Sequence, residues 1–140
     1  MCYNVNMNNK EETFNVNNVS ASSLAFLGDA VFSLCIREYF VKKCLGKSGK
    51  LHEMCSKFVS ASGQSDILKR LMPMLSEEEK AVVKTGRNTF TKSKAKGATL
   101  NSYKKSTGFE ALLGYLHLLN RKERIEEIIA LCLSKTTNAD

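Results

Sequence analysis

The sequence contains few of the residues and runs on which several classes of protein depend. Its 140 residues include two histidines and five cysteines with no CxxC pair, so a zinc site has little to build on and reduced cysteines are expected. No apolar run approaches the ~18 residues of a membrane span, and the N-terminus has no apolar signal-peptide core. We therefore expect a cytoplasmic protein without a membrane segment.

Alternating strand patterns are also absent, and apolar residues recur instead at steps of three and four. Pro73 is the only proline and should end a helix that Gly63 weakens. Ser76 and Glu79 have the spacing of a capping box at the start of the next helix. The pattern predicts an all-α protein of five or six helices, covering about 20–44, 51–71 (divided near Gly63), 77–86, 102–119 and 121–133.

One domain is expected from the length, because 43% of the residues are hydrophobic and can form a single core. Residues 1–19 are rich in asparagine, which buries little apolar surface, and they predict a flexible N-terminal tail. We expect the folded domain to cover residues 20–135 and residues 136–140 to be disordered.

Acidic residues are missing from one long stretch, between Lys80 and Phe109, which holds eight of the 21 basic residues. The other 13 basic residues are balanced by 14 acidic ones, so the net charge of +7 arises in this stretch. Positive charge concentrated in this way attracts a polyanion such as nucleic acid. The alternative is a lysine-rich surface that is only solvated.

Two apolar segments far apart in the chain each carry one carboxylate, Asp29 in residues 24–31 and Glu110 in residues 109–116. A carboxylate on a buried face is costly unless it is paired, and a metal ion is one such partner. Gly28, beside Asp29, would let a neighbouring backbone or a ligand approach closely. If the two segments pack together, their acids form a site suited to Mg²⁺, which prefers hard oxygen ligands.

Both acids also have structural interpretations. Gly28 and Asp29 could form a turn with Asp29 exposed. Residues 107–110 have the spacing of a capping box, in which Glu110 would only stabilise a helix start.

Residues 24–30, LAFLGDA, resemble the signature of the ribonuclease III family, whose usual form is LEFLGDA, and residues 109–114, FEALLG, resemble its second acidic motif. Residues 58–61 with Gln64, residues 86–88, and Tyr103 followed by residues 106–110 are similar to the small branch called Mini-ribonuclease III. The resemblance implies an all-helical endonuclease domain that acts on double-stranded RNA as a homodimer. It also implies Asp29 and Glu110 as catalytic metal ligands, Mg²⁺ with Mn²⁺ able to replace it, 5′-phosphate and 3′-hydroxyl products, and a role in maturing 23S ribosomal RNA precursors.

The chain departs from the larger enzymes of the family at three acidic positions, which are Ser22, Ala25 and Thr107 here. The small branch shares this reduced set, but two other functions stay open. One is a protein that binds double-stranded RNA without efficient cleavage, and the other is a helical protein-interaction module with a basic surface.

RNA binding is expected to rest on the nuclease surface, because the chain leaves no room for the C-terminal RNA-binding domain of the larger enzymes. Arg87 and Asn88 match a branch motif, although Arg87 could instead form an ion pair that fixes its helix. His117 is expected to be a surface histidine, and the roles of Tyr103 and Gln64 are open. The predicted RNA-binding residues are Lys84, Arg87, Asn88, Lys94, Lys96 and Lys104.

Overall fold

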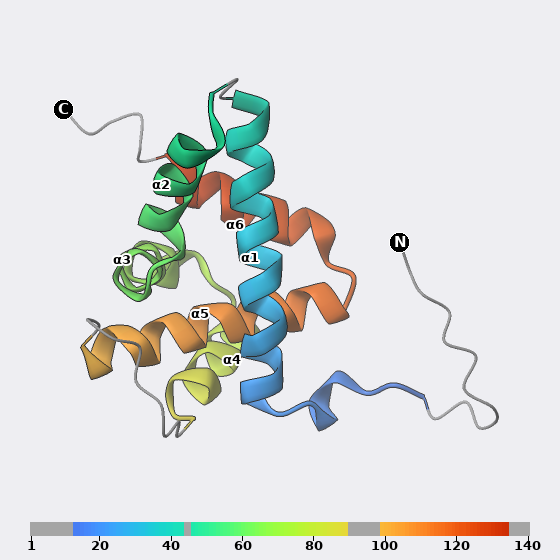
Figure 1. The fold of residues 1–140 in the computed structure, drawn as a ribbon. Coiled ribbons are helices and arrows are strands. Elements are labelled where there is room, and N and C mark those ends of the chain that lie inside the picture. Colours follow the sequence, from blue (N-terminus) through green and yellow to red (C-terminus); the bar gives the residue numbers. More distant parts are fainter. Residues whose placement is uncertain (1–12, 44–45, 90–98, 135–140) are drawn as a thin grey trace.

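The computed structural model describes residues 13–43, 46–89 and 99–134, and within these ranges every regular element is helical. The predicted all-α class is therefore confirmed (Figure 1). The elements are η1 (Val16–Asn18), α1 (Ala21–Lys43), α2 (Ser48–Val59), α3 (Ala61–Leu71), η2 (Met72–Met74), α4 (Glu77–Arg87), α5 (Leu100–Leu118) and α6 (Lys122–Ser134).

Helix α5 is the central element of the fold and packs against α1, α3, α4 and α6 (Figure 1). All of its residues from 106 to 116 are buried except Glu110, which is half-buried. Phe109 meets Phe32 of α1 edge to face, with ring centroids 5.0 Å apart. Because a helix that is apolar on nearly every side has to be covered on every side, α5 determines where the other helices lie.

The helix expected over about 51–71 is divided into two helices, as expected, but the division lies three residues before Gly63. The break lies at Ser60, whose backbone is extended and whose Oγ accepts a hydrogen bond from the Gly63 N–H at 3.1 Å. Serine is a favoured N-cap because it satisfies a free N–H of the first turn. Gly63 lies inside this turn, where a Cβ would overlap the carbonyl oxygen of Lys57.

The predicted capping box at the start of α4 is confirmed. Ser76 Oγ accepts from the Glu79 N–H at 3.2 Å, and Glu79 Oε1 accepts from the Ser76 N–H at 2.8 Å. Glu79 is also buried and receives two hydrogen bonds, each 2.9 Å long, from Arg124 of α6. The cap residue therefore also ties α4 to α6, which the spacing alone could not predict.

A second possible capping box, over residues 107–110, was wrong because these residues lie in the middle of α5. The helix begins two residues earlier than expected, at Leu100. Its N-cap is Thr99, whose Oγ1 accepts from the Ser102 N–H at 3.1 Å. Glu110 therefore has no capping role.

The ends of the described chain carry less structure. Of the expected tail, residues 13–19 are described, and Val16 in η1 is buried against the core. Residues 1–12 and 136–140 lie outside the described residues. In the described part of the chain, no helix is both long and apolar enough to cross a membrane.

Candidate active site

The site begins at the point where α1 crosses α5, and two glycines allow the backbones to touch there. A Cβ on Gly28 would overlap the carbonyl oxygen of Glu110 and lie 2.9 Å from the Gly114 nitrogen. A Cβ on Gly114 would overlap the carbonyl oxygen of Leu24. Gly28 therefore admits a neighbouring backbone, which is one of the two uses expected for it, and the alternative of a turn at Gly28 was wrong because it lies inside α1.

This crossing brings Asp29 and Glu110 together. Asp29 directly follows Gly28, and Glu110 lies one helical turn before Gly114. The expectation that both acids lie on buried faces was wrong for Asp29, which is exposed, whereas Glu110 is half-buried. Burial, with a smaller contribution from the negative charge of Asp29, raises the pKa of Glu110 to about 7. The charge of Asp29 therefore lies close enough to Glu110 to disfavour its ionised form.

Gln64 of α3 is a third member of the site. The motif resemblance singled out Gln64, but its role was open. Its side chain is 1% exposed and forms a hydrogen bond to Glu110 that lowers the pKa of that carboxyl, against the larger effect of burial. Gln64 lies 46 residues from Glu110 along the chain, so neither periodicity nor spacing could connect them.

The two carboxylates suit Mg²⁺ better than a metal ion whose ligands all come from the protein. Within residues 13–43, 46–89 and 99–134, no three His, Cys, Asp or Glu side chains gather in a cluster. Ala25 offers no ligand, Ser22 is exposed, and the Thr107 hydroxyl donates to the Tyr103 carbonyl at 3.0 Å. Mg²⁺ keeps several of its waters and often binds only one or two protein carboxylates, so the acid pair suffices for it.

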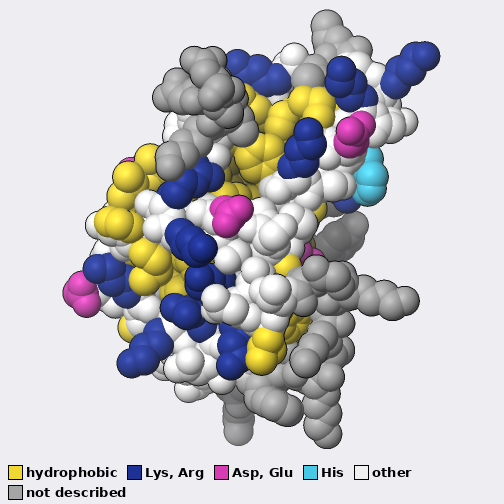
Figure 2. All heavy atoms as spheres, turned by 90° about the vertical axis from the view of Figure 1, so that its left-hand side faces the viewer, with side chains coloured by type: hydrophobic (Ala, Val, Ile, Leu, Met, Phe, Trp, Pro, Cys, Tyr) yellow, Lys and Arg dark blue, Asp and Glu magenta, His cyan; other side chains and the backbone are white. Residues whose placement is uncertain are grey.

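A cationic groove lies on α4, one of the helices that pack against α5. It has a volume of about 390 Å³ and includes the predicted residues Lys84, Arg87 and Asn88 in its lining, with Lys80. A Cβ on Gly108 of α5 would lie 2.8 Å from Arg87 Cγ. The aliphatic part of the Arg87 side chain therefore packs against Gly108, which precedes Glu110 by two residues. Figure 2, which views the side where α5 begins, shows Lys and Arg side chains gathered across this face.

The other predicted basic residues lie on α5 or outside the described chain. Lys104 is exposed on α5, six residues before Glu110, which corresponds to about 9 Å along the helix axis. Lys94 and Lys96 lie outside the described residues. For Arg87, no ion pair is found among the described residues, so the alternative that it fixes its helix through an ion pair lacks support.

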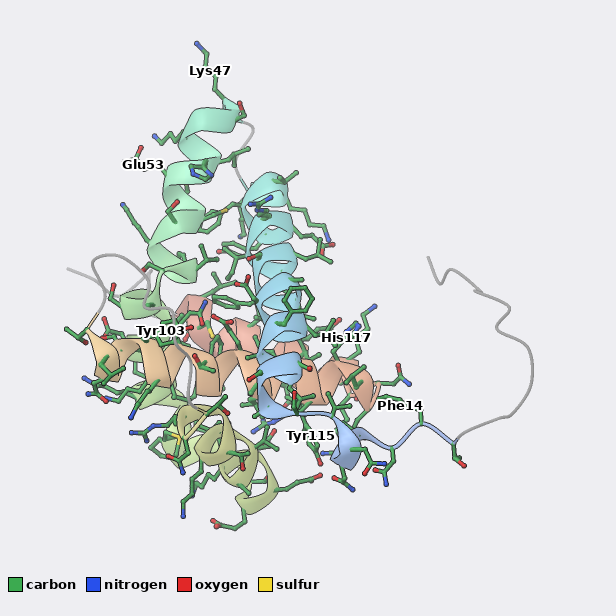
Figure 3. The ribbon with its side chains drawn as sticks, turned by 60° about the horizontal axis from the view of Figure 1, so that its bottom comes forward. Phe14, Lys47, Glu53, Tyr103, Tyr115 and His117 are labelled. Atoms are coloured by element: carbon green, nitrogen blue, oxygen red, sulfur yellow. The ribbon has the colours of Figure 1, made fainter. Side chains whose placement is uncertain are left out.

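Tyr103 and His117 lie toward opposite ends of α5 (Figure 3). His117 is exposed, as expected for a surface histidine, and lies about 10 Å along the helix axis from Glu110. Tyr103 is half-buried, and its carbonyl accepts hydrogen bonds from the side chains of Ser106 and Thr107.

Comparison with known proteins agrees with this geometry. The sequence model of the family described as the ribonuclease III domain matches residues 22–121. This range contains both acids, Gln64 and the cationic groove. The chain belongs to the ribonuclease III family. It is 46% identical over 123 residues to the Mini-ribonuclease 3 of Brevibacillus brevis, covering 88% of this chain and 92% of that protein. It is 41% identical over 122 residues to the Mini-ribonuclease 3 of Streptococcus pneumoniae, covering 86% and 95%.

A solved structure has the same fold. The crystal structure of a protein from Fusobacterium nucleatum superposes with a TM-score of 0.78 at 32% sequence identity, covering 86% of this chain and 97% of that one. The resemblance inferred from the two acidic motifs is therefore confirmed, as is the ribonuclease III type of fold. The reduced acid set at positions 22, 25 and 107 thus belongs to a chain that matches Mini-ribonuclease 3 proteins over most of its length.

Proposed function

We propose that this chain cleaves double-stranded RNA in a Mg²⁺-dependent reaction at Asp29 and Glu110. Membership of the ribonuclease III family makes the chain an endoribonuclease, and the metal, the form of RNA and the residues are our proposal. The observation that carries it is the meeting of Asp29 and Glu110 at the α1–α5 crossing, where the charge of Asp29 acts on Glu110. A cationic groove on α4, which packs against α5, adds a surface for RNA.

The acid pair holds the ion, with Glu110 fixed by burial and Asp29 open to solvent. When bound, Mg²⁺ supplies positive charge to the scissile phosphate and makes a bound water more acidic. Hydrolysis leaves a 5′-phosphate and a 3′-hydroxyl, as the family resemblance implies. The backbone contact at Gly28 keeps the two carboxylates in register for this task.

The cationic surface binds the RNA backbone. Lys84, Arg87 and Asn88 line the groove on α4, and Lys104 lies on α5, the helix that carries Glu110. A-form RNA is recognised mainly through its shape, phosphates and 2′-hydroxyls, which suits a surface of cations and amides. We also propose RNA contacts for Lys94 and Lys96, which lie outside the described residues. From the family resemblance, we include 23S ribosomal RNA precursors in the cytoplasm among the substrates.

A homodimer completes the proposal, supported by an uncovered apolar stripe on α1. Phe26, Leu34 and Val41 are 84%, 67% and 58% exposed, and Ala30 is exposed between the first two. These residues recur at helical spacing, and an exposed apolar patch of this kind marks an interaction surface. Twofold pairing along α1 would present two acid pairs to one duplex, one for each strand.

Dimerisation is tested by light scattering after size-exclusion chromatography. Phe26→Glu should convert the dimer to a monomer, because a charge in the apolar stripe opposes its burial. Met74→Glu is the control, since Met74 is 55% exposed on η2, away from α1. A wild-type monomer at working concentrations would contradict the proposed dimer.

The cleavage proposal is tested with long duplex RNA, with Mg²⁺ and with EDTA. Asp29→Asn and Glu110→Gln should each abolish cleavage while leaving RNA binding largely intact. Asp66→Asn, which changes an exposed acid on α3, should cleave as the wild type does. Cleavage by Asp29→Asn at the wild-type rate would refute the assignment.

A second function, RNA binding without efficient cleavage, is favoured by the missing carboxylates. Ser22, Ala25 and Thr107 leave the site with two acids among the described residues. Under this alternative the wild type would bind duplex RNA and leave it intact at every Mg²⁺ concentration.

A further inference from the structure

Gln64 occupies an unusual place for a polar side chain, in the first turn of a helix and inside the core. Its side chain is 1% exposed, as buried as the apolar residues around it. The Ser60 cap and the tight turn at Gly63 bring this first turn of α3 close to the end of α2. The cap at Ser60 and the contact at Gly63 therefore hold Gln64 next to the end of α2.

The orientation of the amide group is also fixed. Gln64 Nε2 donates a hydrogen bond to the Val59 carbonyl at 3.0 Å. The opposite orientation would place Oε1 against that carbonyl, and two acceptors would face each other. The nitrogen therefore points to Val59, and its second hydrogen is available for the Glu110 carboxylate, to which Gln64 is hydrogen-bonded.

The other end of the amide is not satisfied by the described protein. Among the side-chain polar atoms of residues 13–43, 46–89 and 99–134, Gln64 Oε1 is buried and has no hydrogen-bond partner. Buried acceptors are nearly always paired, with protein or with bound water. A lone acceptor on the residue that holds Glu110 therefore points to a ligand at this site.

We propose that Gln64 is a positioning residue for the divalent ion, holding the Glu110 carboxylate through Nε2 and accepting a hydrogen bond from the ion's water through Oε1. The inference rests on the proposed Mg²⁺ site. It explains how two carboxylates serve where Ala25 and Thr107 add none, because an ion that keeps its waters is also held through their hydrogen bonds. The network joins α2, α3 and α5 at one point.

The test measures the binding of Mn²⁺ in the absence of RNA. The electron paramagnetic resonance signal of free Mn²⁺ reports how much of the ion is bound. Gln64→Met keeps the length of the side chain and removes both polar ends. Removal of a residue that hydrogen-bonds to a metal ligand weakens metal binding by about 10- to 100-fold. We expect a loss of this size for Gln64→Met. Ser65→Ala, which removes a buried hydroxyl from the next position, should bind Mn²⁺ as the wild type does.

Thermal unfolding without metal separates a positioning role from general damage to α3. Gln64→Met and Ser65→Ala should both remain folded at the assay temperature. If Gln64→Met does not, Gln64→Asn decides, because its shorter side chain cannot reach Val59 and Glu110 together and should also weaken Mn²⁺ binding at least 10-fold.

The outcomes distinguish this inference from the function on which it rests. If Asp29→Asn loses Mn²⁺ binding and a folded Gln64 variant keeps wild-type affinity, the role of Gln64 is overturned and the metal site stands. If the wild type binds no Mn²⁺, both are overturned. Loss of affinity in the Gln64 variants with normal binding in Ser65→Ala supports the inference.

Discussion

Gly28 of α1 lies directly against the backbone of Gly114 in α5, with a Cβ on Gly28 placed only 2.9 Å from the Gly114 nitrogen. Neither helix can accept a side chain at this crossing without moving away from the other. The same crossing carries Asp29 and Glu110, so the packing of the core and the spacing of the two acids depend on one contact.

Gly28→Ala should therefore destabilise the protein by about 2 kcal/mol or more, since an added methyl group in a packed core forces backbone shifts. The variant should also lose most of its nuclease activity, because the two carboxylates separate. Denaturant unfolding and duplex cleavage measure these effects.

The matched control for this change is Gly49→Ala in α2, where a Cβ would meet nothing within 4 Å. Alanine is a better helix former than glycine by about 1 kcal/mol, so Gly49→Ala should be neutral or stabilising. Equal stability of the Gly28 and Gly49 variants would contradict the backbone contact.

The ion pair between Arg124 and buried Glu79 should be the most important one for stability in the described chain. Arg124→Met should cost about 2–3 kcal/mol, because it leaves a buried carboxylate without its partner. Lys42→Met is the control, since Lys42 and Glu38 are both exposed and such pairs contribute little.

This loss should depend on pH in a defined direction. The hydrogen bonds from Arg124 lower the pKa of Glu79 below its usual 4.5. A lowered carboxyl pKa contributes stability above the unfolded-state value that is lost as the pH falls through the folded-state value. The difference between wild type and Arg124→Met should therefore be full at pH 7 and shrink below about pH 4.5; a difference that grows on acidification would contradict it.

Metal binding should be coupled to proton release below neutral pH. With its pKa at about 7, Glu110 is largely protonated at pH 6, and an incoming cation must displace that proton. Mn²⁺ affinity should therefore rise with pH to about 7 and level off above it. Calorimetry at pH 6 in buffers of different ionisation enthalpy measures the released proton, and an affinity that is constant between pH 6 and pH 8 would contradict the coupling.

RNA binding should lose salt dependence when the proposed phosphate contacts are removed. Lys84→Ala and Arg87→Ala should each reduce the slope of log K against log salt by roughly 0.7–0.9, and the triple change of Lys94, Lys96 and Lys104 to Ala by two to three such steps. Filter binding with uncleaved duplex in EDTA measures this. Lys122→Ala, at the start of α6, is the control and should keep the wild-type slope; a common loss in all variants would show a general charge effect instead.

The sequence predicted the elements whose pattern is local. Apolar spacing located the helices to within a few residues, and Ser76 with Glu79 marked the start of α4 correctly. The weak helix former Gly63 predicted the division of residues 51–71 only approximately, because the serine cap at Ser60 determines where the chain turns.

The site was predicted only in part, for the same reason. Asp29 and Glu110 could be found because each is an isolated acid in an apolar segment beside a recognisable motif. The exposure of Asp29 and the role of Gln64 depend on which helices meet, and that information is spread over segments far apart in the sequence. The position of Arg87 against Gly108 also follows from the packing of α4 on α5.

The direct backbone contact between α1 and α5 has a consequence for how such a chain can change over time. Main-chain atoms, rather than side chains that substitution can change, meet where Asp29 and Glu110 come together. Substitutions elsewhere in the chain leave those main-chain atoms in place, so only changes at Gly28 and Gly114 would act directly on the spacing of the two acids that we propose hold the metal.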